Sequence, residues 1–96
     1  MSRIKHIRSK RSEILKLAMF HGATSIMVFG SATRSEDRDG SDIDFLVTLE
    51  AGRNAFDLGG LLMDLQDLLG CRVDLVTDKG LSPLLRDKVL KEAVNL

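Results

Sequence analysis

Residues 28–47, VFGSATRSEDRDGSDIDFLV, decide the fold of this chain. They read as a short apolar run, a turn at Gly30 and Ser31, a charged loop and a second apolar run that holds two carboxylates. Because side chains alternate between the two faces of a strand, Asp42 and Asp44 project to the same side if a strand begins there. A buried charge must be paired or must hold a metal ion. The stretch therefore predicts a divalent cation at the start of the second strand.

Length and composition indicate one small domain over residues 1–96, with 44% hydrophobic and 29% charged residues. The formal net charge is zero, which argues against a general nucleic-acid binder. The charge is unevenly placed, because residues 1–21 hold six basic side chains and one acidic side chain. We interpret this basic segment as a solvated helix surface, with docking to an acidic partner as the alternative.

Nothing in the sequence predicts export or insertion into a membrane. The basic N-terminal residues are not followed by the apolar segment of a signal peptide, and no apolar run approaches the ~20 residues of a membrane span. The single cysteine, Cys71, cannot form an internal disulfide and fits a reducing compartment. We therefore expect a cytoplasmic protein that does not bind membranes, with Cys71 as a packed or half-exposed thiol.

Hydrophobic periodicity and turn residues predict the elements in chain order. Apolar residues at helical spacing predict a helix over residues 3–21, interrupted near Ser9 or Ser12, and strand formers predict strands over residues 25–29, 43–49 and 72–77. A leucine stripe predicts a helix over residues 56–69, whose start Gly59 and Gly60 are expected to delay.

Ser82 and Pro83 predict the start of a last helix. Its apolar face is predicted at Leu85, Val89, Leu90 and Ala93. With a short helix after Ser31, the order is α-β-α-β-α-β-α. This order predicts an α+β fold, a small mixed sheet of three or four strands with helices packed against it.

A third carboxylate, Asp74, stands within the third predicted strand. If that strand pairs with the second, Asp74 lies opposite Asp44, and Asp42 joins them in one patch. Carboxylates that close together favour Mg²⁺ or Mn²⁺. Gly30 and Ser31 offer backbone N–H groups and a hydroxyl, which suit a phosphate. Metal and phosphate together indicate a nucleoside triphosphate and two-metal transfer chemistry.

These residues resemble a known family. Gly30-Ser31, ten further residues and then Asp42-Ile43-Asp44 match the GSx₁₀DxD signature of the DNA polymerase β-like nucleotidyltransferases, and the context looks like their minimal branch. The resemblance covers essentially the whole chain. The spaced combination with a later strand aspartate is far more specific than either motif alone.

The resemblance implies a role for each motif residue. Gly30 and Ser31 would bind the triphosphate of ATP, and Arg34 would steady a phosphate or the leaving pyrophosphate. Asp42 and Asp44 would ligate two Mg²⁺ ions, with Mn²⁺ as the alternative, and Asp74 would complete the metal site or act as base. The chain departs from the pattern at two positions that in relatives often hold Arg and Gly, since here they are Ala32 and Ser35. One phosphate-binding cation is thereby missing.

The resemblance also implies a partner. Members of the minimal branch look like antitoxins that transfer AMP from ATP to a tyrosine of a helical HEPN ribonuclease toxin, with which they form a hetero-oligomer. One alternative is a catalytically weak or inactive subunit that neutralises the toxin by binding alone. Another is a nucleotidyltransferase that acts on a small molecule or RNA, which the lack of a substrate domain makes the weaker hypothesis.

Overall fold

The computed structural model describes residues 3–30 and 42–96. Two helices, α1 (Arg3–Ser9) and α2 (Arg11–Phe20), lead into strands β1 (Ala23–Phe29) and β2 (Ile43–Leu49). Helix α3 (Ala55–Leu69), strand β3 (Val73–Thr77), a 3₁₀ turn (Asp78–Gly80), helix α4 (Pro83–Glu92) and strand β4 (Val94–Asn95) follow. The break between α1 and α2 lies at Lys10, beside the predicted interruption, and the predicted helix after Ser31 lies outside the described residues.

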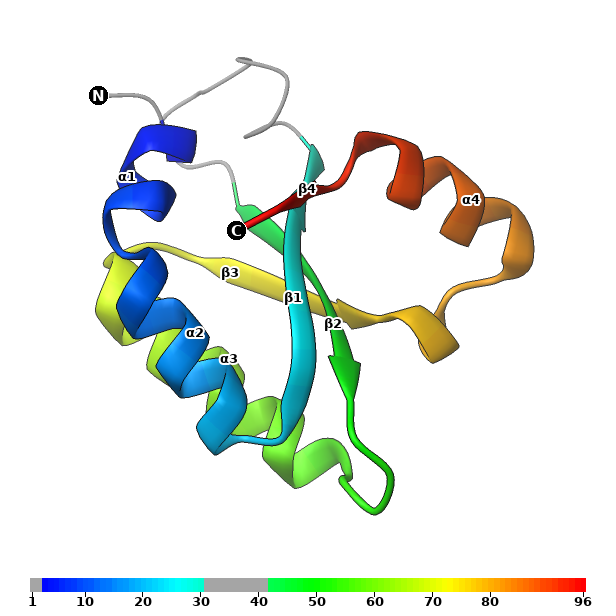
Figure 1. Cartoon of the computed structure of the whole chain (residues 1–96), viewed down its shortest axis with the longest axis horizontal. Coiled ribbons are helices and arrows are strands. Elements are labelled where there is room, and N and C mark those ends of the chain that lie inside the picture. The colour runs from blue at the N-terminus through cyan, green and yellow to red at the C-terminus, as the bar shows by residue number, and fades with distance from the viewer. Residues whose placement is uncertain (1–2, 31–41) are drawn as a thin grey trace.

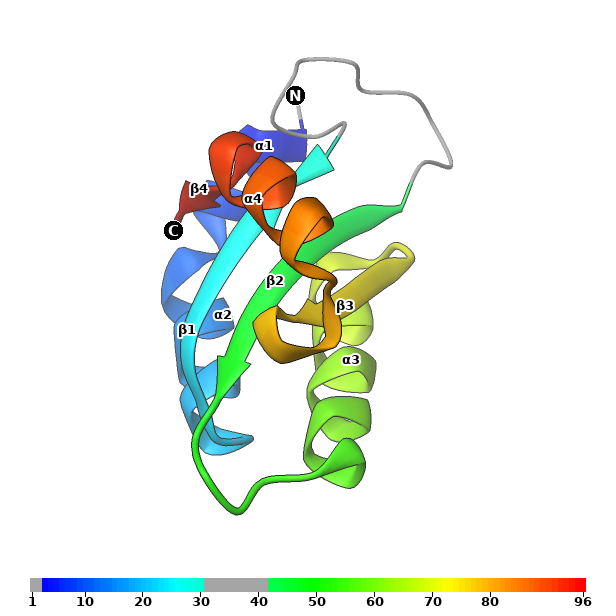
Figure 2. The ribbon, with the colours of Figure 1, turned by 90° about the vertical axis from the view of Figure 1, so that its right-hand side faces the viewer.

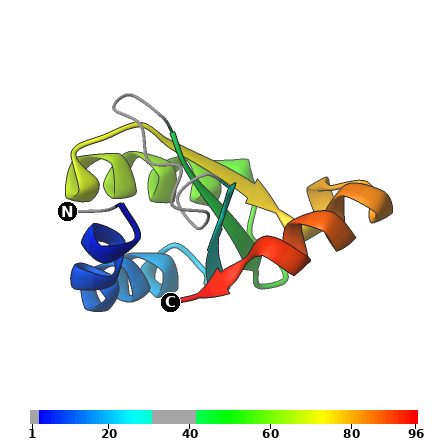
Figure 3. The ribbon, with the colours of Figure 1, turned by 90° about the horizontal axis from the view of Figure 1, so that it is seen from above.

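The four strands form one mixed sheet in the order β3-β2-β1-β4. Strand β1 is antiparallel to β2 and β4, whereas β2 and β3 are parallel and are joined through α3. Helices α1, α2 and α3 lie on one face of the sheet, and α4 lies on the other side (Figures 1 and 3). The predicted α+β fold with a small mixed sheet is confirmed.

The core lies between the sheet and helices α1, α2 and α3, which cover one of its faces. Ile43, Phe45 and Val47 of β2 are almost fully buried there. The other core residues come from the neighbouring strands and from α1, α2 and α3, and include Ile7, Ile14, Val28, Leu61 and Leu65. The alternation along β2 therefore turns its even-numbered residues toward the opposite face.

Helix α3 begins earlier than the two glycines predicted, so the expectation of a late start is wrong. The Asn54 side chain accepts a hydrogen bond from the backbone N–H of Phe56 at 2.9 Å, and the Asp57 carboxylate accepts one from the backbone N–H of Asn54 at 3.0 Å. This capping box satisfies donors at the helix start, and it offsets part of the cost of two glycines, about 1 kcal/mol each.

The C-terminal segment packs differently from the prediction. Ser82 caps α4 by accepting a hydrogen bond from the backbone N–H of Leu85, as predicted. No residue of α4 is buried, however, and the side chains of Leu84 and Leu85 are 82% and 53% exposed. Figure 2 shows α4 standing before the sheet, away from the helices that enclose the core. Strand β4 was not predicted, because two residues are too short to show a periodic pattern.

Candidate active site

The face of the sheet opposite α1, α2 and α3 carries the predicted aspartates. Because Ile43 and Phe45 point into the core, Asp44 between them points to this other face. Asp74 occupies the same position in β3, since Val73 and Leu75 pack against the core on either side of it. Asp44 is half-buried and Asp74 is exposed. Both carboxylates thus lie on one side of the sheet, within reach of a substrate.

The register of the sheet brings Asp44 and Asp74 together. They are paired residues of the parallel β2–β3 ladder, one row after the Ile43–Val73 pair. Neighbouring strands lie about 4.8 Å apart, so two like charges stand side by side. The prediction that Asp74 lies opposite Asp44 is confirmed.

Gly30 lies directly against Asp44, at the end of β1. Phe29 pairs with Asp44 across the antiparallel β1–β2 ladder. Gly30 has a φ of 80°, in the left-handed region that favours glycine. A Cβ atom at this position would come within 2.5 Å of Asp44 Oδ2. The glycine therefore lets the chain turn beside the carboxylate. Ser31 and Arg34, the other predicted nucleotide-binding residues, lie outside the described residues.

Asp42 lies directly before β2, close to the side chain of Arg72. The sequence analysis did not single out Arg72 as a site residue. Its Oδ1 is 3.7 Å from Nε of Arg72, and the two side chains are 46% and 84% exposed. The backbone carbonyl of Arg72 accepts a hydrogen bond from the N–H of Ile43 at 3.1 Å. Arg72 precedes Asp74 by two residues, and this spacing on a strand is the signal that places both on one face.

The donor set fits a hard divalent cation in its chemistry. Three carboxylates at the same ends of two adjacent strands supply the oxygen ligands that Mg²⁺ and Mn²⁺ prefer. Among residues 3–30 and 42–96, however, no three Asp, Glu, His or Cys side chains are gathered tightly enough to hold an ion as they stand. Asp44 and Asp74 are paired across the ladder, whereas Asp42 lies beside Arg72.

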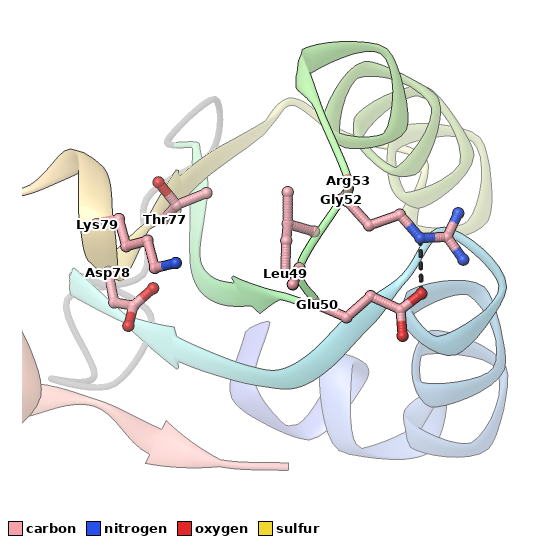
Figure 4. Close-up of a pocket in the computed structure, with 8 residues that line it drawn as sticks. Leu49, Glu50, Gly52, Arg53, Thr77, Asp78 and Lys79 are labelled. Carbon is pink, nitrogen blue, oxygen red and sulfur yellow. Dashed lines mark hydrogen bonds and ion pairs between the residues drawn. The ribbon is translucent and has the colours of Figure 1, made fainter.

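A cavity in the described part of the chain lies elsewhere. It measures about 190 Å³ and is lined by residues after β2 and β3, including Glu50, Arg53 and Lys79. Figure 4 shows Arg53 turned toward Glu50, whose Oε1 lies 2.7 Å from the Arg53 Nε. Because the cavity lies at Leu49, at the end of β2 opposite the end that carries Asp44, it is remote from the aspartate pair.

Cys71, His21 and His6 lie apart from the aspartate pair and contact other parts of the fold. Cys71 is half-buried, as predicted, and burial raises the pKa of its thiol, which disfavours the nucleophilic thiolate. His21 caps the C-terminus of α2, and its Nε2 lies 2.6 Å from Asp64 Oδ2 on α3. A ring nitrogen of His6 lies 3.3 Å from the carbonyl oxygen of Leu69.

No helix within residues 3–30 and 42–96 is long and apolar enough to cross a bilayer.

A mixed sheet with three helices on one face, and with paired strand aspartates beside a glycine on the other, is the architecture of a nucleotidyltransferase. The chain belongs to this family, since the model of the nucleotidyltransferase domain matches residues 4–96. The protein is thus a nucleotidyltransferase by fold and by family.

Relatives and solved structures agree with this assignment. The chain is 36% identical over 91 residues to the "Putative protein adenylyltransferase MJ0435" of Methanocaldococcus jannaschii, covering 95% of this chain and 98% of that protein. A solved "Structure of putative minimal nucleotidyltransferase" superposes with a TM-score of 0.90 at 45% identity, covering 100% of this chain and 97% of that one.

Two solved toxin–antitoxin assemblies share the fold. A "toxin-antitoxin with AMP-PNP" matches with a TM-score of 0.75 at 26% identity, covering 88% of this chain and 69% of that chain. A complex of a tri-AMPylated Shewanella oneidensis HEPN toxin with its MNT antitoxin matches with a TM-score of 0.68 at 23% identity, covering 99% and 71%. The second likeness concerns the fold alone.

Proposed function

We propose that the protein transfers AMP from ATP to a tyrosine of a partner HEPN ribonuclease toxin in the cytoplasm and thereby neutralises the toxin. The observation that carries this proposal is the register pair of Asp44 and Asp74 on the face that α1, α2 and α3 leave uncovered. The adenylyltransferase name of a relative covered over 98% of its length and the toxin–antitoxin assembly with AMP-PNP support the choice of nucleotide and of a toxin as partner.

In the proposed site, Asp42, Asp44 and Asp74 would hold two Mg²⁺ ions, with Mn²⁺ as the alternative. The bound ions would withdraw charge from the triphosphate and from the leaving group. Gly30 and Ser31 would hold the triphosphate, and Arg34 would steady the pyrophosphate.

The reaction joins the tyrosine oxygen to the α-phosphorus of ATP. Asp74, which is exposed, takes the phenolic proton as the oxygen attacks. The bond between the α-phosphorus and the oxygen that bridges to the β-phosphate breaks, and pyrophosphate leaves.

The test uses the full chain, the product of the neighbouring gene, Mg²⁺ and ATP labelled on its α-phosphorus. We expect the label on the partner with the wild-type protein and none with Asp44→Asn, while mass spectrometry locates the AMP group on a tyrosine. An unlabelled partner in both reactions, with folded proteins that bind each other, would refute the transfer.

A second candidate is a subunit that neutralises the toxin by binding alone. The observation in its favour is that no three metal-ligating side chains are gathered within the described part of the chain. Ribonuclease assays separate the two functions. If Asp44→Asn inhibits the toxin as fully as the wild-type protein does, binding is sufficient. If only the wild-type protein with ATP and Mg²⁺ inhibits it, catalysis is required.

A further inference from the structure

Arg72 and Asp42 form a second row beside the aspartate pair. In the β2–β3 ladder, Ile43 pairs with Val73 and Asp44 with Asp74. The hydrogen bond from the Ile43 N–H to the Arg72 carbonyl continues this ladder by one step. Asp42 and Arg72 therefore stand side by side on the face of the Asp44–Asp74 pair, about 7 Å along the strands.

The geometry of the ion pair between Asp42 and Arg72 allows Arg72 to exchange Asp42 for another partner. Arg72 Nε lies 3.7 Å from Asp42 Oδ1, beyond hydrogen-bonding distance, and the Arg72 side chain is 84% exposed. Exposed pairs of this kind contribute little to stability because water screens both charges. The guanidinium is thus free to rotate without disturbing the core.

The charges of the site indicate which partner Arg72 binds before and after a cation arrives. Before a cation binds, Arg72 offsets the charge of Asp42, the carboxylate at the open end of the cluster. A divalent cation competes for the same oxygen with twice the charge. Arg72 then needs an anion, and a planar guanidinium suits a phosphate because it donates two parallel hydrogen bonds.

We propose that Arg72 is a nucleotide-positioning residue that holds Asp42 in the metal-free protein and passes to a phosphate of the bound nucleotide when metal takes Asp42. This role rests on the proposed function, because it assumes that Asp42 becomes a ligand. It assigns a phosphate-binding cation to the residue before β3, on the opposite side of β2 from Gly30.

Arg72→Gln tests both halves of the exchange through binding alone. Calorimetry with Mn²⁺ and no nucleotide should show about threefold tighter binding, because the competing cation is gone. With Mg²⁺ present, α,β-methylene ATP, which cannot release pyrophosphate, should bind about tenfold more weakly, the loss expected for a charge-assisted hydrogen bond. Arg72→Lys should restore part of the nucleotide affinity, since it keeps the charge without the fork.

Arg86→Gln is the matched control. Arg86 is also an exposed arginine near one aspartate, since its Nη2 lies 3.9 Å from Asp78 Oδ2. Arg86→Gln changes the net charge by the same amount as Arg72→Gln. Both affinities should stay at wild-type values in this variant. If Arg72→Gln fails to shift the two affinities in opposite directions, or if Arg86→Gln shifts them alike, the exchange is refuted. A wild-type protein that binds neither Mn²⁺ nor the nucleotide would instead refute the proposed function.

Discussion

Asp44 stands opposite Asp74 in the parallel β2–β3 ladder, so two carboxylates face the same solvent with one strand spacing between them. Like charges directly opposite each other destabilise a sheet. The same repulsion makes the pair a strong attractor for a cation. Without a bound cation, the repulsion between Asp44 and Asp74 should therefore lower the stability of the folded protein.

Neutralising one member of this pair should stabilise the metal-free protein. We expect Asp74→Asn to raise the free energy of unfolding in EDTA by up to about 1 kcal/mol and to abolish AMP transfer. Urea unfolding followed by circular dichroism measures the first effect. Asp87→Asn, on the exposed surface of α4, removes the same charge away from the pair and should change the stability little. A less stable Asp74→Asn protein would contradict the repulsion.

Gly30 should be indispensable for the position of Asp44. An alanine there meets Asp44 Oδ2 at 2.5 Å in addition to the strain of a φ of 80°. Gly52 has a similar φ of 88° and open space around the added Cβ, so Gly52→Ala measures the strain alone.

We expect both substitutions to cost about 1 kcal/mol of stability through backbone strain. Only Gly30→Ala should add a further loss from the contact with the carboxylate and weaken Mn²⁺ binding. Urea unfolding and calorimetry on the two variants measure these effects. Equal losses in both would show that the contact with Asp44 is unimportant.

The two glycines of α3 should respond in opposite directions to alanine. Gly59 has open space around it, so Gly59→Ala should stabilise the protein by about 0.5–1 kcal/mol through helix propensity. A Cβ at Gly60 would lie 2.8 Å from the His21 ring, so Gly60→Ala should displace His21 from Asp64 and lower the melting temperature. Thermal unfolding measures the melting temperatures of both variants. A rise in both would contradict the predicted clash at Gly60.

Asp57 should make the stability of α3 depend on pH. The hydrogen bond from the Asn54 N–H lowers the pKa of the Asp57 carboxyl below its ordinary 3.8, and Arg53 adds to the effect. A lowered pKa gives a contribution that is full above the ordinary value and is lost as the pH falls through the folded value. The difference in stability between wild type and Asp57→Asn should therefore be full at about pH 7 and smaller at about pH 3, below the ordinary pKa of 3.8. A constant difference in urea unfolding at both values would exclude the charge as its cause.

Much of this protein could be predicted from local sequence because the determinants are local. Alternation in the second apolar run predicted β2 with its observed bounds and placed Asp42 and Asp44 on one side. Ser82 and Pro83 correctly marked the start of α4. The same local reasoning was wrong about the start of α3, since it weighed the glycines and overlooked the capping box at Asn54.

The sequence by itself determined where the three longer strands lie, that Asp44 faces away from the core and which family the motif resembles. Tertiary structure decided the parallel β2–β3 register, the contact of Gly30 with Asp44, the pairing of Asp42 with Arg72 and the exposure of α4. The reason is physical. Periodicity and capping act within one segment, whereas a register or an ion pair between strands depends on how distant segments pack over the same core.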